Sequence, residues 1–221
     1  MRRDGRCDCP GRELDRAGRR GGTHLTPRAG LDTEAVVDAA EELADADGLE
    51  ALSLAVVAKR LGVRAPSLYV HIAGLDDLRR RLAIRGARQL AATLQKAAVG
   101  RARDDALGAV AEAYRAYARE HPGAYAVLQR APHPDDAEGK AAAAEAVDVF
   151  VRLLRGYGIQ QDDAIHATRI IRAALQGFVS LEAGGGFGLP LDVDETFARL
   201  TAVLAQGLAA GVHRPGAAQP I

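Results

Sequence analysis

The pattern of apolar and polar residues predicts helices along most of the chain. Apolar side chains recur three and four positions apart, and no stretch shows the alternation typical of a strand. Asp32 and Gly48 bracket the first such run, in the places usual for an N-cap and for a residue just after a helix. The fold class is therefore all-α, with about nine helices. The predicted helices cover about 32–47, 54–61, 64–71, 76–98, 104–120, 122–130, 137–156, 162–183 and 194–210.

Two short predicted helices, joined by a tight turn at Gly62, lie between two longer ones. Ser53 can cap the first short helix, and Pro66 is tolerated in the opening turn of the second. This arrangement is typical of a helix-turn-helix, whose second helix enters the major groove of DNA. The exposed positions of that second helix are predicted to be Arg64, Ala65, Ser67, Tyr69, Val70 and His71. An ordinary helix pair, whose Tyr and His complete a core, is the alternative.

The same run resembles the DNA-binding domain of the TetR family of transcriptional regulators. That domain follows the pattern L-S-x-x-x-V/L-A-x-x-L-G-V-x-x-x-S/T-L-Y-x-H-F. The matching residues are Leu52, Ser53, Val57, Ala58, Leu61, Gly62, Val63, Ser67, Leu68, Tyr69 and His71, followed by Asp76, Asp77 and Leu78 at the next helix start. Two positions depart from the pattern: Ile72 replaces the usual Phe, and Leu75 replaces a Lys that reaches a phosphate in the family.

The resemblance implies particular DNA contacts. By matching position, base edges lie next to Ala65, Pro66 and Tyr69, and the phosphate backbone contacts Ser53, Ser67, Tyr69 and His71. Arg64 is added on chemical grounds, because a guanidinium can reach a phosphate or a guanine edge. Leu75 cannot supply the family's phosphate contact, so we expect Arg79 or the residues before the first helix to compensate.

Residues 1–30 carry eight Arg and four acidic residues and show no apolar period. We expect them to form a disordered basic arm. Arg28 is the best candidate there for a DNA contact, because it lies just before the first helix. A solvated tail without a role in DNA binding, or a start codon placed too early, is the alternative that the composition favours. The other predicted domains are a helix-turn-helix domain over 31–77, a ligand-binding and dimerisation domain over 78–212, and a frayed tail over 213–221.

The C-terminal two thirds resemble the TetR proteins with a WHG-type C-terminal domain. The signals are YRAYAREHPGAYAVL at 114–128 and LQGFVSLEAGGGFGLPLDVDETFARL at 175–200. In such proteins the last two helices of two subunits pack as a four-helix bundle. The small residues Gly177 and Ser180 agree with a close helix contact, although the same stripe can pack within one subunit. We expect a homodimer, because two helix-turn-helix units one DNA turn apart read a palindrome.

The resemblance also implies a ligand pocket inside the helical bundle. The candidate lining residues are Tyr114, Tyr117, Tyr125, Leu128, Phe150, Leu154, His166, Arg169, Ile170 and Phe178. A few polar groups among apolar ones suit a small-molecule cavity. For each residue, packing in the core is the alternative. A buried Arg169 needs a partner, either an anionic ligand or a carboxylate such as Asp162 or Glu145.

The composition limits the kinds of partner and site that the chain can have. The 221 residues carry 29 basic and 29 acidic side chains, so DNA would have to bind a local basic patch. Both Cys lie in the first ten residues, at Cys7 and Cys9, so neither a disulfide framework nor a metal site is expected. No secretory signal or membrane-spanning run is predicted, and the expected compartment is the cytoplasm.

The predicted function is a ligand-responsive transcriptional regulator, a repressor that a small molecule releases from a palindromic double-stranded DNA operator. The sequence shows no nucleophile elbow and no phosphate loop, so neither an enzyme activity nor a cofactor is expected. The alternative is a helical protein that binds a ligand or partner without binding an operator. Its support is the Leu75 departure.

Overall fold

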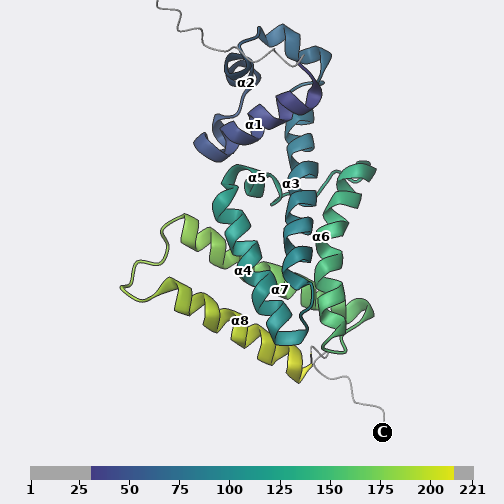
Figure 1. The fold of residues 1–221 in the computed structure, drawn as a ribbon, viewed down its shortest axis with the longest axis vertical. Coiled ribbons are helices and arrows are strands. Elements are labelled where there is room, and N and C mark those ends of the chain that lie inside the picture. The colour runs from purple at the N-terminus through teal and green to yellow at the C-terminus, as the bar shows by residue number, and fades with distance from the viewer. Residues whose placement is uncertain (1–30, 212–221) are drawn as a thin grey trace, which may run out of the picture. The chain divides into compact units, whose positions relative to one another are not determined.

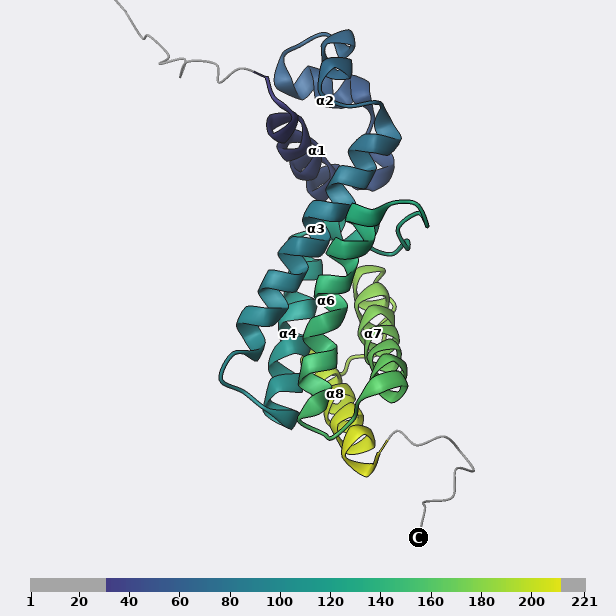
Figure 2. The same cartoon turned by 90° about the vertical axis from the view of Figure 1, so that its right-hand side faces the viewer.

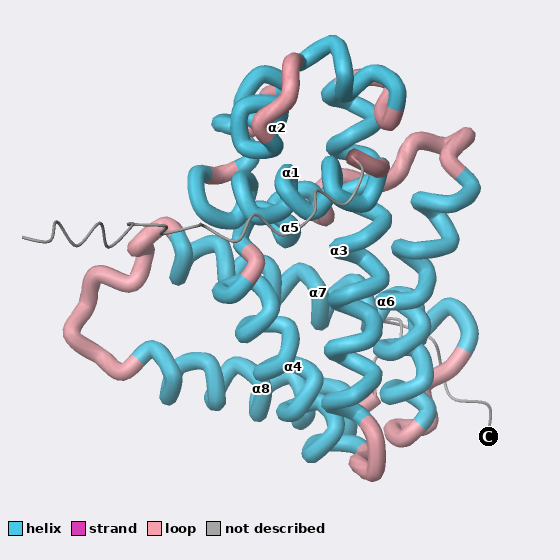
Figure 3. Tube along the Cα trace, turned by 45° about the horizontal axis from the view of Figure 1, so that its top comes forward, coloured by secondary structure: helices cyan, strands magenta, loops and turns pink. Residues whose placement is uncertain are grey.

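The computed structural model describes residues 31–211, which form helices and loops with no strand among them (Figure 1). Figure 3 shows the same residues coloured by secondary structure. The elements are α1 (Thr33–Asp47), the 3-10 helix η1 (Leu49–Ala51), α2 (Leu54–Leu61), the 3-10 helix η2 (Ala65–Val70), α3 (Leu75–Ala98), α4 (Arg103–Glu120), α5 (Pro122–Val127), α6 (Ala137–Arg155), α7 (Gln161–Ala183) and α8 (Val193–Ala210). The all-α prediction is confirmed. The predicted arm with Arg28 and the predicted tail lie outside the described residues.

The capping residues of the first helices are those that the sequence suggests. Asp32 and Ser53 each accept a backbone N–H from the first turn of α1 and α2. α7 begins one residue before the predicted range of 162–183. Asp162 therefore lies inside its first turn, where the negative charge interacts favourably with the helix dipole, and Gln160 precedes the helix without a side-chain cap. Asp77 is likewise inside α3, where its carboxylate accepts a backbone N–H from the preceding loop.

The second short helix is a 3-10 helix and not the α-helix predicted over 64–71. Gly62 ends α2 in the left-handed conformation at φ 68°, which suits a residue without a Cβ. Pro66 has no N–H to donate, and the N–H of Ser67 donates to the carbonyl of Arg64 at 2.9 Å, three residues back. Leu68 is fully buried and anchors η2.

The core of the C-terminal bundle is filled by large side chains. Phe150 and Leu154 of α6 and Ile171 and Leu175 of α7 are at most 1% exposed. α3 packs against α4 and α6, and Figure 2 shows these helices side by side with α7. None of the helices within residues 31–211 combines the length and the apolar character needed to cross a membrane.

An ion-pair cluster joins α1 to α3, the helix that leads from the helix-turn-helix into the bundle. Arg85 of α3 pairs with three acidic residues of α1, which are Glu34, Asp38 and Glu41. The Arg85 side chain is 19% exposed and that of Glu41 is 15% exposed, so part of the cluster is shielded from water. The acidic outer face of α1 thereby holds the first half of α3.

A second contact joins the end of α1 to the start of α5. The carboxylate of Asp45 accepts the backbone N–H groups of Gly123 and Ala124 at 2.8 and 3.0 Å, which caps α5 from a distant part of the chain. The approach is too close for a side chain at position 123, where a Cβ would lie 2.2 Å from the carbonyl carbon of Ala44. Glycine is therefore required at this crossing.

Candidate nucleic-acid interface and ligand clefts

The inner side of the helix-turn-helix is a small apolar core. Val57 and Ala58 of α2, Leu68 of η2 and Ile72 just after it are at most 3% exposed. Ile72, which stands where the family pattern usually has Phe, is buried as that pattern requires. These contacts hold η2 against α2 and so fix the positions of the outer side chains of η2.

The predicted DNA-contacting residues lie on the outer side. Arg64, Pro66, Ser67 and Tyr69 are exposed, whereas Ser53, Ala65 and His71 are partly buried. Tyr69 is 60% exposed and Val70 beside it is 82% exposed, so the end of η2 presents an aromatic hydroxyl and an apolar side chain to the solvent. The oxygen of Ser53 accepts the N–H of Val56, which leaves its hydroxyl hydrogen free to donate outward.

Positive charges adjoin this surface. Arg64 and Lys59 are exposed and form no ion pair within residues 31–211. Arg60 pairs with Glu42 at 2.6 Å, but both side chains are more than half exposed, so the pair is weak and exchangeable. Lys59 is not among the DNA contacts predicted from the sequence. It could have been selected as a basic residue in the last turn of α2, next to the recognition element. Arg79, expected to replace the lost contact at Leu75, instead lines a cleft where its Nε is buried.

Most residues predicted to line an interior pocket are buried in the core. This group comprises Tyr114, Tyr117, Tyr125, Phe150, Leu154 and Phe178, and none of them lines either cleft described below. The Tyr114 and Tyr125 hydroxyls lie 3.0 Å apart, and the hydroxyl of Tyr117 donates to the Gly86 carbonyl at 3.1 Å. Burial raises the pKa of all three tyrosines, so they remain protonated.

Three of the predicted pocket residues are placed wrongly. His166, Arg169 and Ile170 are exposed on the outer side of α7, and Ile170 is 50% exposed. The inner side of α7 is formed instead by Ala167 and Ile171, which are fully buried. Arg169 therefore needs no buried partner.

The buried arginine is Arg115 of α4, which the sequence reasoning did not select. It is 2% exposed, and its Nε donates to Glu182 at 3.0 Å while its Nη2 lies 2.7 Å from Asp194. The guanidinium also lies over the rings of Phe178 and Phe197, at 5.3 and 4.7 Å from their centroids. Arg115 and Arg119 together lower the pKa of Glu182 to about 2, chiefly through the hydrogen bond from Arg115.

The larger of two clefts has a volume of about 740 Å³. It is lined by the first half of α3, by the end of α5 and the loop after it, by the start of α6, and by Leu49 and Glu50 of η1. Of the residues predicted to bind a ligand, only Leu128 lines it. The volume is within the usual range for small-molecule sites.

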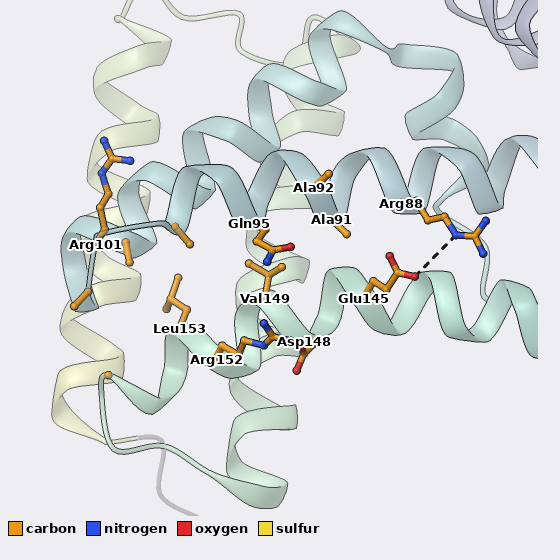
Figure 4. A pocket seen from close by; sticks show the side chains of 14 residues that line it. Arg88, Ala91, Ala92, Gln95, Arg101, Glu145, Asp148, Val149, Arg152 and Leu153 are labelled. Carbon is orange, nitrogen blue, oxygen red and sulfur yellow. Dashed lines mark ion pairs between the residues drawn. The ribbon is translucent and has the colours of Figure 1, made fainter.

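The smaller cleft, of about 380 Å³, lies between α3 and α6 (Figure 4). Its floor is made of small or apolar residues such as Ala91 and Val149, and its charged groups come from both helices. Arg88 faces Glu145 at 3.9 Å, and Arg152 pairs with Asp148. Because these charges satisfy one another, this cleft presents little unused binding capacity.

An apolar face remains open on α7 and α8. Ile165, Ile170 and Leu181 of α7 are 40, 50 and 52% exposed, and Val203 of α8 is 64% exposed. Exposed small residues, which include Ala173, Gly177 and Ser180, accompany them on α7. Large apolar side chains exposed on two packed helices are a common feature of contacts with another protein chain.

Both halves of the chain match family models. Residues 36–82 match the model described as "Bacterial regulatory proteins, tetR family". Residues 107–204 match the model described as "Tetracyclin repressor-like, C-terminal domain". The first match covers most of α1, then η1, α2, η2 and the start of α3, and the second covers most of α4 to α8.

Two curated relatives are similar over most of their length. An uncharacterized HTH-type transcriptional regulator of Mycobacterium tuberculosis, Rv0681, is 38% identical over 81% of this chain and 83% of the relative. Another from Bacillus subtilis, YobS, is 37% identical over 78% of this chain and 90% of the relative. A solved structure of a protein with unknown function from Rhodococcus sp. RHA1 shares the fold, with a TM-score of 0.71, 24% identity, and coverage of 84% of this chain and 99% of that one.

Proposed function

Since the chain belongs to the TetR family of bacterial transcriptional regulators, we propose that it binds an operator as a homodimer and represses until a small molecule releases it. One observation supports operator binding above the others. Tyr69 projects from η2, which the buried Leu68 holds in place, at a position that matches the family's DNA-reading helix, and Arg64 is exposed directly before η2.

In this proposal η2 enters the major groove. Tyr69 and Arg64 reach base edges or nearby phosphates, and Ala65 and Pro66 contact thymine methyl groups. The N-terminus of α2, with the free hydroxyl hydrogen of Ser53, faces a phosphate. Lys59 adds a sequence-independent contact at a position that partly offsets the missing lysine at 75.

Dimerisation is proposed to cover the open face of α7 and α8. Ile170 and Val203 lose their exposure to water when a second copy packs there, and Gly177 lets the two α7 helices approach closely. Two recognition elements are then held at a fixed separation, as palindromic half-sites require.

Ligand control is proposed to act through α3. A ligand changes operator affinity only if it binds the two conformations of the protein unequally. The contacts of Arg85 and Asp45 tie α1 to α3 and α5, so a shift of either helix moves the helix-turn-helix with it.

Operator binding is tested by fluorescence anisotropy with DNA fragments from upstream of the protein's own gene and its neighbours. Tyr69→Ala is expected to weaken binding on the order of tenfold, as the loss of one groove contact does. The matched control is Val99→Ala, which alters another exposed side chain directly after the end of α3. If no fragment binds even at low salt, the alternative of a ligand- or partner-binding protein without an operator replaces this proposal.

The dimer is tested by sedimentation equilibrium on Ile170→Glu and on the control Val99→Glu. Only Ile170→Glu is expected to yield monomers, because it introduces a charge into the proposed interface. A dimer that is unaffected by this change would place the interface elsewhere.

A further inference from the structure

The larger cleft has a polar end and an apolar end. Ala83, Ile84 and Ala87 of α3 face it together with Val127 and Leu128 from the end of α5, and these form an apolar wall. Arg79, Arg80, Arg130 and His133 supply its cationic and polar groups, and Glu50, Asp76 and Asp136 also line it. The lining residues therefore carry no large net charge. What the cleft can bind depends on which of these charged side chains already form ion pairs with one another.

Arg79 is the group whose binding capacity is unused. Its Nε is buried and has no hydrogen-bond partner, the single such side-chain atom within residues 31–211. A guanidinium stays charged at all ordinary pH values and has five donors, so a buried donor without an acceptor is unfavourable. The terminal Nη groups of the same guanidinium also form no hydrogen bond within residues 31–211, and a ligand in the cleft can offer them an acceptor.

Asp136 cannot serve Arg79, because it is already engaged, and neither Glu50 nor Asp76 forms an ion pair within residues 31–211. Arg80 donates from Nε and Nη2 to the two carboxylate oxygens of Asp136, at 2.8 and 2.6 Å. Asp136 also accepts the N–H of Gly139 at 2.9 Å, as the cap of α6. Within the described residues, Arg79 and Arg130 form no ion pair, and both line the cleft.

We propose that this cleft binds an amphipathic carboxylate, with the carboxylate on the guanidinium of Arg79 and the apolar body along Ala83, Ile84 and Leu128. A planar guanidinium fork matches a carboxylate with two parallel hydrogen bonds, which a neutral alcohol cannot make. The volume of about 740 Å³ accommodates a ligand of medium size. The smaller cleft lacks such a group, because its arginines face carboxylates.

The position of the cleft suggests what such a ligand controls, a step that rests on the proposed function. Leu49 and Glu50 belong to η1, between α1 and α2, whereas Leu128 and Pro132 belong to the end of α5 and the loop after it. An occupant therefore contacts the DNA-reading half and the bundle at once. It also contacts the first turns of α3, directly after the helix-turn-helix.

Binding is tested by isothermal titration of the full-length protein, without DNA, with octanoate, decanoate and 2-naphthoate, each below any micellar concentration. 1-Octanol, 1-decanol and 2-naphthol are the matched neutral probes. At least one carboxylate is expected to bind about tenfold or more tightly than its neutral partner, as the loss of a charge-assisted hydrogen bond implies. Equal binding of each pair, or no binding of any carboxylate, overturns the proposal.

Two variants test the position of the site, and a third variant serves as the control. Arg79→Gln and Ala83→Phe, the second of which fills the apolar end, are each expected to reduce carboxylate affinity at least tenfold while circular dichroism shows a folded protein. Arg152→Gln, in the smaller cleft, is expected to bind as the unmodified chain does. Unchanged affinity in both site variants refutes the assignment.

A separate operator assay keeps the two proposals distinguishable. If a carboxylate binds through Arg79 but operator affinity stays the same, the cleft assignment stands and ligand control is refuted. If operator binding is observed and no carboxylate binds, the cleft assignment alone fails.

Discussion

The Arg115–Glu182 pair permits a quantitative prediction about stability. Glu182→Gln removes the charge that faces a guanidinium with only 2% exposure, while it preserves the size of the side chain. The lowering of the Glu182 pKa from 4.5 to about 2 corresponds to about 3 kcal/mol of stabilisation by the ionised form. The Glu182 side chain is 17% exposed, so solvent screening reduces this value only modestly. Asp194 is 75% exposed and compensates only in part.

The sign of the pH dependence follows from the depressed pKa. Ionised Glu182 stabilises the folded chain fully above pH 4.5, and this contribution disappears as the pH falls from 4.5 toward 2. The difference in unfolding free energy between the original chain and Glu182→Gln is therefore expected to be about 3 kcal/mol at pH 7 and to shrink steadily below pH 4.5.

The assay is urea unfolding followed by far-ultraviolet circular dichroism at several pH values. Protein concentration is held constant, since association contributes to the apparent stability. Glu195→Gln is the control, because its exposed pair with Arg199 contributes no more than about 0.5 kcal/mol. A loss below about 1 kcal/mol at pH 7, or a loss that does not change between pH 5 and pH 3, would refute the reasoning.

Three further predictions concern the DNA-reading half and its contact with α5. Leu68→Ala should lower the unfolding free energy by about 2–5 kcal/mol and weaken operator binding, because Leu68 anchors η2 and is fully buried; an unchanged urea midpoint would contradict this. Gly123→Ala should destabilise the chain, since the new Cβ would meet the backbone of Ala44 at 2.2 Å, and Gly108→Ala, at an open position, is the control in the same thermal melt. Leu75→Lys should tighten operator binding and steepen its dependence on salt by about one phosphate contact, as measured by anisotropy from low to moderate salt; an unaltered salt slope would show that position 75 does not face a phosphate.

The helices were predictable because their ends carry strong local signals. The predicted range 54–61 matches α2, and that of α1 differs by one residue, since Asp32 and Ser53 cap these helices and Gly48 and Gly62 follow them. The 3-10 form of η2 was not predicted. It depends on Pro66 and on the burial of Leu68 against other elements, which spacing along the chain does not reveal.

The candidate ligand site was predicted less well, for a physical reason. α7 carries apolar residues on two sides, with Ile171 facing the core and Ile170 facing outward. A helical period cannot tell which of two neighbouring apolar stripes packs within the chain. The partners of Arg115 were also hidden, because Glu182 and Asp194 lie more than 60 residues away in sequence, and only the packing of α7 and α8 brings them to α4.

The contact between Asp45 and α5 has a consequence for protein engineering. A designer who wished to give this regulator a different DNA-binding half would naturally exchange the residues before the middle of α3. The exchanged segment would bring a foreign α1, whose last turn must accept the backbone of Gly123 at van der Waals distance and supply a carboxylate to its N–H. A chimaera that keeps Ala44 and Asp45, or that transfers the first turn of α5 with α1, should fold with its two halves in register. A chimaera without this contact leaves the backbone N–H groups at the start of α5 without the Asp45 carboxylate and should be less stable.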